Sequence, residues 1–355
     1  MTGPRWGGAV VERLTGPRWG GGLDTLLGVL GAGEAVAAAF GLGRATGPLV
    51  PLSYRSSRTW TLSTRDGRVL VKQGATEEWR EDFARAMRFE EKALAAGIAM
   101  GRPVRPPGAA FGYAVEVEGV GLVRAYEWID GRSLDDTDDV SEWLGTTLAR
   151  LHRIEPLAPE RGPAGEGAPE WYRLDDAEGW AGWLREGERL GKPWAPALRE
   201  GMAGVVDAAS WVRRVFEQAG DHVVTHRDVE PWNVLMTGKG PVLIDWDVAG
   251  PDSARLEAAQ ATFSFSTRAG MPEAAVVRRT VDAYADGGGA RFAGEDVLVR
   301  RVGLRLGRLA ERLRMSLGLE PLGPHDRATI ETQAVERITD LPAFVEGIKL
   351  FARLL

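Results

Sequence analysis

The chain has 355 residues, a formal charge of −6 and no cysteine. Its length suffices for one large or two modest domains. The lack of cysteine excludes disulfides, cysteine-ligated zinc, iron–sulfur clusters and a thiol nucleophile, and it fits a cytoplasmic protein. Because the balance of charges is mildly acidic, we expect no nucleic acid as a partner.

The first 48 residues are predicted to form a glycine-rich leader followed by helices. The heptapeptide TGPRWGG occurs at residues 2–8 and again at 15–21, and two copies are too few for a solenoid. The apolar window 25–42 is rich in alanine and glycine and contains Glu34. We therefore expect packed helices there, and no membrane span.

Residues 49–128 are predicted to form a small sheet domain. Strands are expected at 57–64 and 68–73, joined by a turn at Asp66-Gly67. An amphipathic helix is expected over 77–96. Two further strands are expected at 111–117 and 121–128.

Residues 129–355 are predicted to form a larger, mainly helical domain that includes a catalytic loop. Its first helices are expected at 140–152, 174–190 and 197–219. The acidic run at 135–139 precedes the first of them, where negative charge favours the helix macrodipole; a cation-binding patch is the alternative. A strand is expected from Val223, then a hairpin of residues 234–236 and 242–244, and then helices to the C-terminus.

The most informative segment is His226-Arg-Asp-Val-Glu-Pro-Trp-Asn233, followed by a hairpin whose second strand ends in Asp245-Trp-Asp247. The hairpin would bring Asn233 and Asp245 together, and their oxygen atoms suit Mg²⁺ held jointly with substrate phosphates. Asp228, which the metal does not need, could accept a proton or orient a hydroxyl. These groups are the equipment of phosphoryl transfer.

This segment resembles the catalytic loop and metal-binding segment of the aminoglycoside phosphotransferase and choline kinase group, which has the protein-kinase-like fold. Residues 245–247 are similar to that group's Asp-Trp-Glu/Asp signature, 148–152 to its Leu-His helix end, and 127–131 to its hinge. The resemblance covers about residues 49–260. It implies an α+β, bilobal fold with a small antiparallel-sheet N-lobe and a larger, mainly helical C-lobe.

The resemblance also implies ATP and Mg²⁺ as cofactors and assigns the site residues. Asp228 would be the catalytic base, and Asn233 and Asp245 would bind the metal. Lys72, at the end of a strand, would hold the nucleotide phosphates, and Glu90 on the next helix would orient it. Further nucleotide contacts assigned on this basis are the hydroxyl and hinge residues Ser56, Ser57, Glu127 and Ile129.

Several residues depart from the family pattern or have structural interpretations. Residues 53–58, where a glycine-rich phosphate loop is expected, contain no glycine. Arg227 follows the histidine where antibiotic kinases usually have glycine, and Glu257 stands where many relatives have a structural aspartate. His226 is expected to brace the loop through hydrogen bonds, and His152 to be packed in the core.

Three functions follow as hypotheses. The first is an ATP-dependent phosphotransferase that acts on a hydroxyl of a small molecule such as an antibiotic. The second is a kinase subunit that phosphorylates Ser or Thr of a ribosomally made precursor peptide, and this hypothesis includes a partner protein. The third is a nucleotide-binding pseudokinase or scaffold, against which the intact catalytic residues argue.

One face of the predicted helix 299–315 is basic. Its arginines recur at i, i+4, i+7 and i+11, beside an apolar stripe that would pack on the domain: Arg301, Arg305, Arg308 and Arg312, with Val302, Leu306, Leu309 and Leu313. Arg305 and Arg308 are predicted to face the acceptor or a partner, which would disfavour a polycationic acceptor. The alternative is a solvated basic face that pairs with acids elsewhere.

Overall fold

The computed structural model describes residues 31–52, 58–74, 80–108, 111–157, 168–268, 270–322 and 325–355. The chain divides into two compact units. The first comprises the described parts of Met1–Val140 and Thr225–Gly250, and the second those of Ser141–Val224 and Pro251–Leu355.

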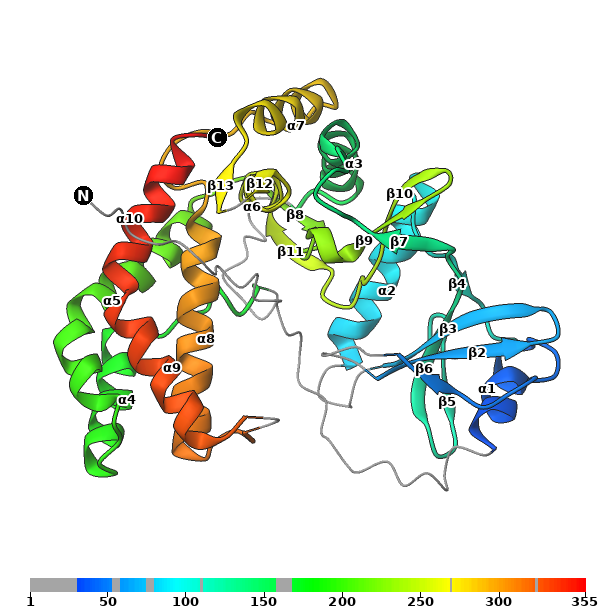
Figure 1. Ribbon diagram of the computed structural model, residues 1–355, viewed down its shortest axis with the longest axis horizontal. Coiled ribbons are helices and arrows are strands. Elements are labelled where there is room, and N and C mark those ends of the chain that lie inside the picture. The colour runs from blue at the N-terminus through cyan, green and yellow to red at the C-terminus, as the bar shows by residue number, and fades with distance from the viewer. Residues whose placement is uncertain are drawn as a thin grey trace. The chain divides into compact units, whose positions relative to one another are not determined.

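The first unit contains a six-stranded antiparallel sheet (Figure 1). Its strands follow the order β1-β2-β3-β6-β4, and β5 also pairs with β6. The strand bounds are β1 (Val50–Pro51), β2 (Thr59–Thr64), β3 (Gly67–Gln73), β4 (Pro103–Val104), β5 (Ala114–Val117) and β6 (Gly121–Glu127). The predicted turn joins β2 to β3, where Gly67 adopts a positive φ of 141°. This antiparallel sheet confirms the predicted fold of the small domain.

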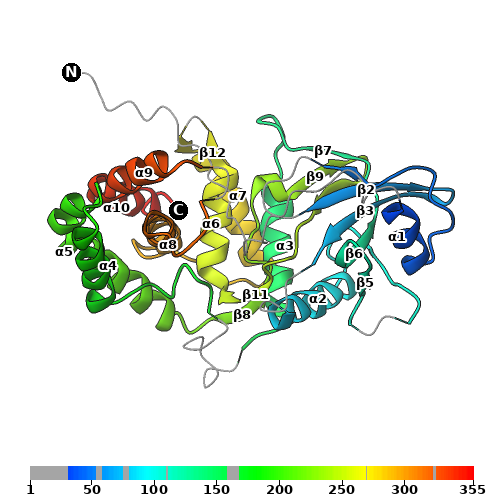
Figure 2. The ribbon, with the colours of Figure 1, turned by 90° about the horizontal axis from the view of Figure 1, so that it is seen from below.

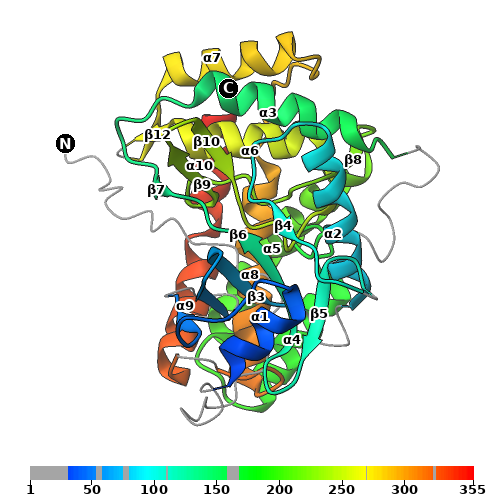
Figure 3. The same ribbon diagram turned by 90° about the vertical axis from the view of Figure 1, so that its right-hand side faces the viewer.

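Alternating side chains give the sheet two different faces. Helix α1 (Ala32–Phe40) packs on one face, in a core that includes Val71, Val123 and Ala125 (Figure 3). Helix α2 (Arg80–Ala95) contributes Phe83 to a second core, with Leu122 on the other face (Figure 2). The intervening positions of β3 and β6 therefore face away from the α1 core.

A second, three-stranded sheet belongs to the same unit. Strand β9 (Val234–Thr237) lies between β10 (Gly240–Leu243) and β7 (Gly131–Ser133). The Leu243 N–H also donates to the Ala99 carbonyl at 2.9 Å, just after α2. These pairings group residues 225–250, which include the predicted catalytic loop, with the small sheet unit. Helix α1 belongs to the same unit, and the predicted domain boundaries after residues 48 and 128 stay predictions.

The second unit is mainly helical, as predicted. The predicted helices at 140–152, 174–190 and 197–219 are present within a few residues of these bounds. The helices are α3 (Ser141–Ile154), α4 (Ala177–Arg189), α5 (Ala195–Glu217), α6 (Ala254–Ser266), α7 (Ala274–Asp286), α8 (Val299–Leu317), α9 (Arg327–Thr339) and α10 (Leu341–Ala352). Short strands accompany them: β8 (His222–Thr225), β11 (Gly250–Ser253), β12 (Thr267–Arg268) and β13 (Met271–Pro272).

The core of the second unit is built around α6, which is buried on nearly every side. The imidazole of His152 on α3 lies 2.8 Å from the Glu257 carboxylate on α6 and 2.8 Å from the Tyr284 hydroxyl on α7. His152 is therefore packed, as expected, and it joins three helices. The apolar stripe predicted on α8 is buried as well. None of the helices in the described part of the chain is both long and apolar enough to cross a membrane.

Gly145 is required by the contact between α3 and α7. A Cβ atom there would lie 2.4 Å from the Thr280 carbonyl oxygen and 2.7 Å from the Tyr284 nitrogen, and backbone atoms cannot move aside as a flexible side chain can. We expect Gly145→Ala to lower the free energy of unfolding by about 1–3 kcal/mol, measured by urea denaturation.

Gly204 on α5 provides the matched control, because a Cβ atom there meets nothing within 4 Å. The Gly204→Ala change should raise the free energy of unfolding by about 0.5–1 kcal/mol, since alanine has the higher helix propensity. Equal effects of the two substitutions would show that the close packing at Gly145 does not limit stability.

Candidate active site

The loop between β8 and β9 brings Asp228 and Asn233 together. A turn of 3-10 helix, Pro231–Asn233, ends at Asn233. The Asn233 Nδ2 donates to the Asp228 carbonyl at 2.9 Å and to its Oδ2 at 2.7 Å. The nitrogen of the Asn233 side-chain amide thus fixes the Asp228 carboxylate. The oxygen of the same amide is the atom that could coordinate a metal.

His226 braces this loop from within. Its Nδ1 accepts from the Asp228 N–H at 3.2 Å, so the proton sits on Nε2, which donates to the Ile244 carbonyl at 3.1 Å. The ring also contacts Trp246, with centroids 4.6 Å apart. His226 therefore links the catalytic loop to the Asp245-Trp246-Asp247 segment, which is the bracing role we expected.

Two non-glycine residues of the site have left-handed backbone conformations. The φ angles are 67° at Arg227 and 68° at Asp245. Such conformations cost energy in L-residues and persist where the surroundings enforce them, often at functional sites. Gly250 leaves room for the Arg227 side chain, because a Cβ atom there would lie 2.7 Å from the Arg227 guanidinium carbon.

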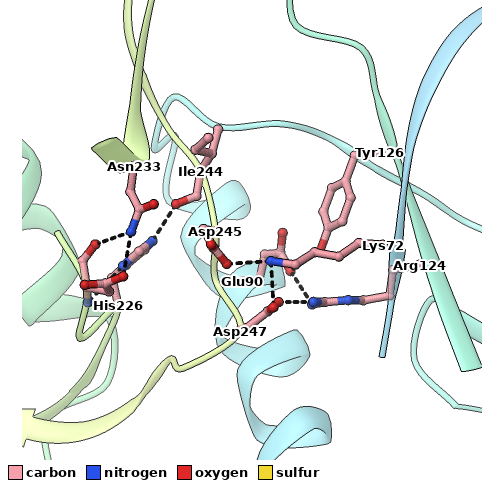
Figure 4. Close-up of polar contacts among 10 residues, drawn as sticks. Lys72, Glu90, Arg124, Tyr126, His226, Asn233, Ile244, Asp245 and Asp247 are labelled. Atoms are coloured by element: carbon pink, nitrogen blue, oxygen red, sulfur yellow. Dashed lines mark hydrogen bonds and ion pairs between the residues drawn. The ribbon is translucent and has the colours of Figure 1, made fainter. Parts of the chain in front are cut away.

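Lys72 points at both carboxylates of the Asp245-Trp246-Asp247 segment (Figure 4). Its Nζ lies 2.5 Å from the Asp245 Oδ1 and 2.6 Å from the Asp247 Oδ2. Burial alone would lower the pKa of Lys72, but the two carboxylates outweigh burial and raise it. Lys72 is thus a charged ammonium group at the edge of the proposed metal site.

Glu90 has partners other than the expected one. Its carboxylate accepts hydrogen bonds from the hydroxyls of Tyr113 and Tyr126, and lies 3.6 Å from the Arg124 guanidinium. No ion pair found among the described residues joins it to Lys72. Burial raises the pKa of Glu90 to about 7, although Arg124 acts in the opposite direction.

Sequence reasoning missed Arg124 and Asp247 as members of this cluster. Arg124 is fully buried and contacts the Asp247 carboxylate. Burial would raise the pKa of Asp247, but Lys72 and Arg124 outweigh burial and hold the pKa below its ordinary value. The available signal was an arginine at an inward-facing position of the apolar strand Gly121–Glu127, since buried charges are rare unless they are paired.

The site has suitable donors for a magnesium ion. The Ile244 N–H donates to the Asn233 carbonyl at 2.9 Å, which sets Asp245 beside Asn233. Their side-chain oxygens are hard ligands, and Mg²⁺ is commonly bound by one or two such protein groups together with substrate phosphates and water. The Asn233 and Asp245 side chains therefore fit a magnesium ion, which they would hold together with substrate phosphates.

The other residues assigned to the nucleotide stay predictions. Ser56 and Ser57 lie outside the described residues. Glu127 ends β6, where its N–H donates to the Arg102 carbonyl at 2.9 Å. Ile129 follows in the segment between β6 and β7, which is the expected position of a hinge.

The arginines of α8 have partners within the second unit. The Arg305 guanidinium stacks 4.6 Å from the Phe344 ring centre and donates to the Arg337 carbonyl at 3.3 Å. Arg312 donates to the Gln333 amide oxygen at 2.8 Å. These contacts favour a structural use of the basic face, and the role of Arg305 and Arg308 in acceptor binding stays a prediction.

Comparisons with known proteins agree with this chemistry. The model of the phosphotransferase enzyme family matches residues 50–294. A 43-residue segment is 54% identical to a trifolitoxin immunity protein from Rhizobium leguminosarum bv. trifolii, and it spans 12% of this chain and 16% of that protein.

Solved structures show the same fold. A microcompartment-associated aminopropanol kinase superposes with a TM-score of 0.57 at 19% identity, over 88% of this chain and 94% of the kinase. A spectinomycin phosphotransferase in complex with ADP and spectinomycin gives a TM-score of 0.56 at 11% identity, over 83% of this chain and 93% of that enzyme. These matches confirm the predicted protein-kinase-like fold.

Proposed function

The chain belongs to the phosphotransferase enzyme family, and we propose that it transfers the γ-phosphate of ATP to a hydroxyl group of a small molecule. The observation that carries this proposal is the meeting of Lys72 with Asp245 beside the Asp228–Asn233 pair. We also propose a cytoplasmic location, because ATP is available there.

Each residue of the site has a separate task in this reaction. Asp228 would orient the acceptor hydroxyl and accept its proton, and the amide of Asn233 holds the carboxylate in place for this. Lys72 would neutralise charge on the nucleotide phosphates. Asp245 and Asn233 would hold Mg²⁺, whose positive charge stabilises the charge that develops on the transferred group.

Related proteins support a small molecule as the acceptor. The aminopropanol kinase and the spectinomycin phosphotransferase are named for small molecules that carry hydroxyl groups. The name of the trifolitoxin immunity protein refers to protection from a toxin, and it favours neither a small molecule nor a peptide as the acceptor. A precursor peptide is the alternative class, and the test below includes it.

A transfer screen identifies the acceptor class. The protein is incubated with Mg²⁺ and γ-labelled ATP and with three pools: aminocyclitol antibiotics, small amino alcohols, and Ser- and Thr-containing peptides. We expect label in a product of one of the small-molecule pools. Label confined to the peptide pool would replace the proposed acceptor, whereas label in no pool, with ATP unbound, would contradict phosphotransfer.

A further inference from the structure

We propose that Lys72 is positioned by Asp247 and Arg124, and that Glu90 acts on Lys72 through Arg124 instead of touching it. This inference rests on the proposed function, because the position of Lys72 affects turnover only if Lys72 binds the nucleotide phosphates. It makes Arg124 a positioning residue: it is fully buried, and its guanidinium binds the Asp247 carboxylate that also pairs with Lys72.

The register of the sheet brings the two cations side by side. Lys72 on β3 is the direct cross-strand partner of Arg124 on β6, so the two side chains project from the same face of the sheet. Adjacent like charges destabilise a sheet unless something neutralises them. Asp247 does so, because one of its oxygens contacts Lys72 at 2.6 Å and the other contacts the Arg124 Nη2.

The surroundings of Arg124 fix its guanidinium. The guanidinium carbon lies 4.4 Å from the ring centre of Phe83 on α2 and 5.6 Å from that of Tyr126. Glu90, on the same helix as Phe83, lies 3.6 Å away and adds a negative charge. A planar, permanently charged guanidinium can stack, pair with Glu90 and bond Asp247 at once, which the single ammonium of a lysine cannot do.

The way in which Asp245 and Asp247 share Lys72 explains why Asp247 is needed to orient that lysine. In the structure Lys72 is shared between Asp245 and Asp247. If Asp245 holds Mg²⁺, as proposed above, Asp247 would be the carboxylate left to orient Lys72. Helix α2 then influences Lys72 through a relay of Glu90, Arg124 and Asp247 (Figure 4).

A double-mutant cycle tests the relay. The variants are Arg124→Met, Glu90→Gln and the double variant, with Arg124→Lys as the conservative replacement. Arg105→Met serves as the matched control, because this exposed arginine pairs with Glu91 on α2 outside the cluster. Each variant is measured for the KM of ATP, the KM of the acceptor found in the screen, Mg-ATP affinity by calorimetry, and thermal unfolding.

We expect Arg124→Met to weaken Mg-ATP binding and raise the KM of ATP by roughly 10- to 100-fold, by analogy with the range known for groups that orient metal ligands. The acceptor KM should stay unchanged, Arg124→Lys should recover part of the loss, and Arg105→Met should behave as wild type. Glu90→Gln alone should raise the KM of ATP several-fold. In the Arg124→Met background it should raise the KM of ATP no further. A purely structural role would lower the unfolding temperature without this split between the two KM values.

Other outcomes would overturn the relay. Additive losses from Glu90→Gln and Arg124→Met would show that Glu90 acts on Lys72 independently of Arg124. Wild-type ATP affinity in Arg124→Met would show that Arg124 does not position Lys72. If Arg124→Met fails to fold, unchanged ATP affinity in both Arg124→Lys and Glu90→Gln would overturn the relay equally. A wild-type protein that binds no Mg-ATP would instead contradict the proposed function itself.

Discussion

Replacing Asp228 with alanine should reduce phosphoryl transfer by about 10²–10⁴-fold, the usual contribution of a positioned general base, and leave Mg-ATP affinity nearly unchanged. Asp228 is held by the Asn233 amide at 2.7 Å, and we assign it to the acceptor hydroxyl, so its loss should remove the proposed base and spare the nucleotide site. Steady-state transfer assays and calorimetry on the same preparation measure the two effects.

The control for Asp228→Ala is Asp82→Ala, which removes a half-exposed carboxylate paired with Arg85 on α2. This variant should transfer phosphate at the wild-type rate. Wild-type turnover in Asp228→Ala would exclude Asp228 as the base. A parallel loss of nucleotide affinity and turnover in that variant would show that Asp228 belongs to the nucleotide site.

Replacing Asp245 with asparagine should abolish the part of ATP affinity that depends on Mg²⁺. Asparagine tolerates the left-handed backbone at this position better than alanine does, so the loop geometry is preserved. The substitution removes the negative charge of the Asp245 carboxylate. We propose this carboxylate as a metal ligand, and it also pairs with Lys72 at 2.5 Å. The triphosphate charge would then lack part of its neutralisation, and turnover should fall below detection.

Calorimetric titrations of ATP with Mg²⁺ and with a chelator measure this effect. The wild-type protein should bind ATP more tightly with Mg²⁺ than with the chelator. The Asp245→Asn variant should bind ATP equally weakly under both conditions. If the variant keeps the wild-type difference, the metal is held elsewhere, and the assignment of Asn233 as the second ligand loses its basis as well.

Local sequence signals predicted much of this molecule. The Asp66-Gly67 turn fixed the β2–β3 hairpin that ends near Lys72, because turn chemistry acts within a few residues. The spacing from His226 to Asn233 and the hairpin that follows placed Asp228, Asn233 and Asp245 near one another for the same reason. The structure has each of these elements within a few residues of its predicted position.

The partners of Glu90 could not be predicted in the same way. Arg124 and Asp247 are separated by 123 positions in the chain, and their contact depends on the register between β3 and β6 and on the path of the chain after β10. The family motif by itself pairs Glu90 with Lys72. It does not reveal that a second buried cation, Arg124, lies beside Lys72 and pairs with Glu90. The grouping of the catalytic loop with the small sheet likewise depends on long-range contacts such as that between Leu243 and Ala99.

The most direct test of the proposed phosphoryl transfer is a phosphorus NMR measurement. It uses the wild-type protein with ATP, Mg²⁺ and the acceptor found in the screen. We predict a phosphomonoester signal on the acceptor that grows in equal amounts with ADP. ADP accompanied only by inorganic phosphate would show hydrolysis without transfer, and an unchanged ATP spectrum would show a protein that only binds nucleotide. Either result would contradict the conclusion that Asp228, Asn233, Asp245 and Lys72 form a phosphotransferase site.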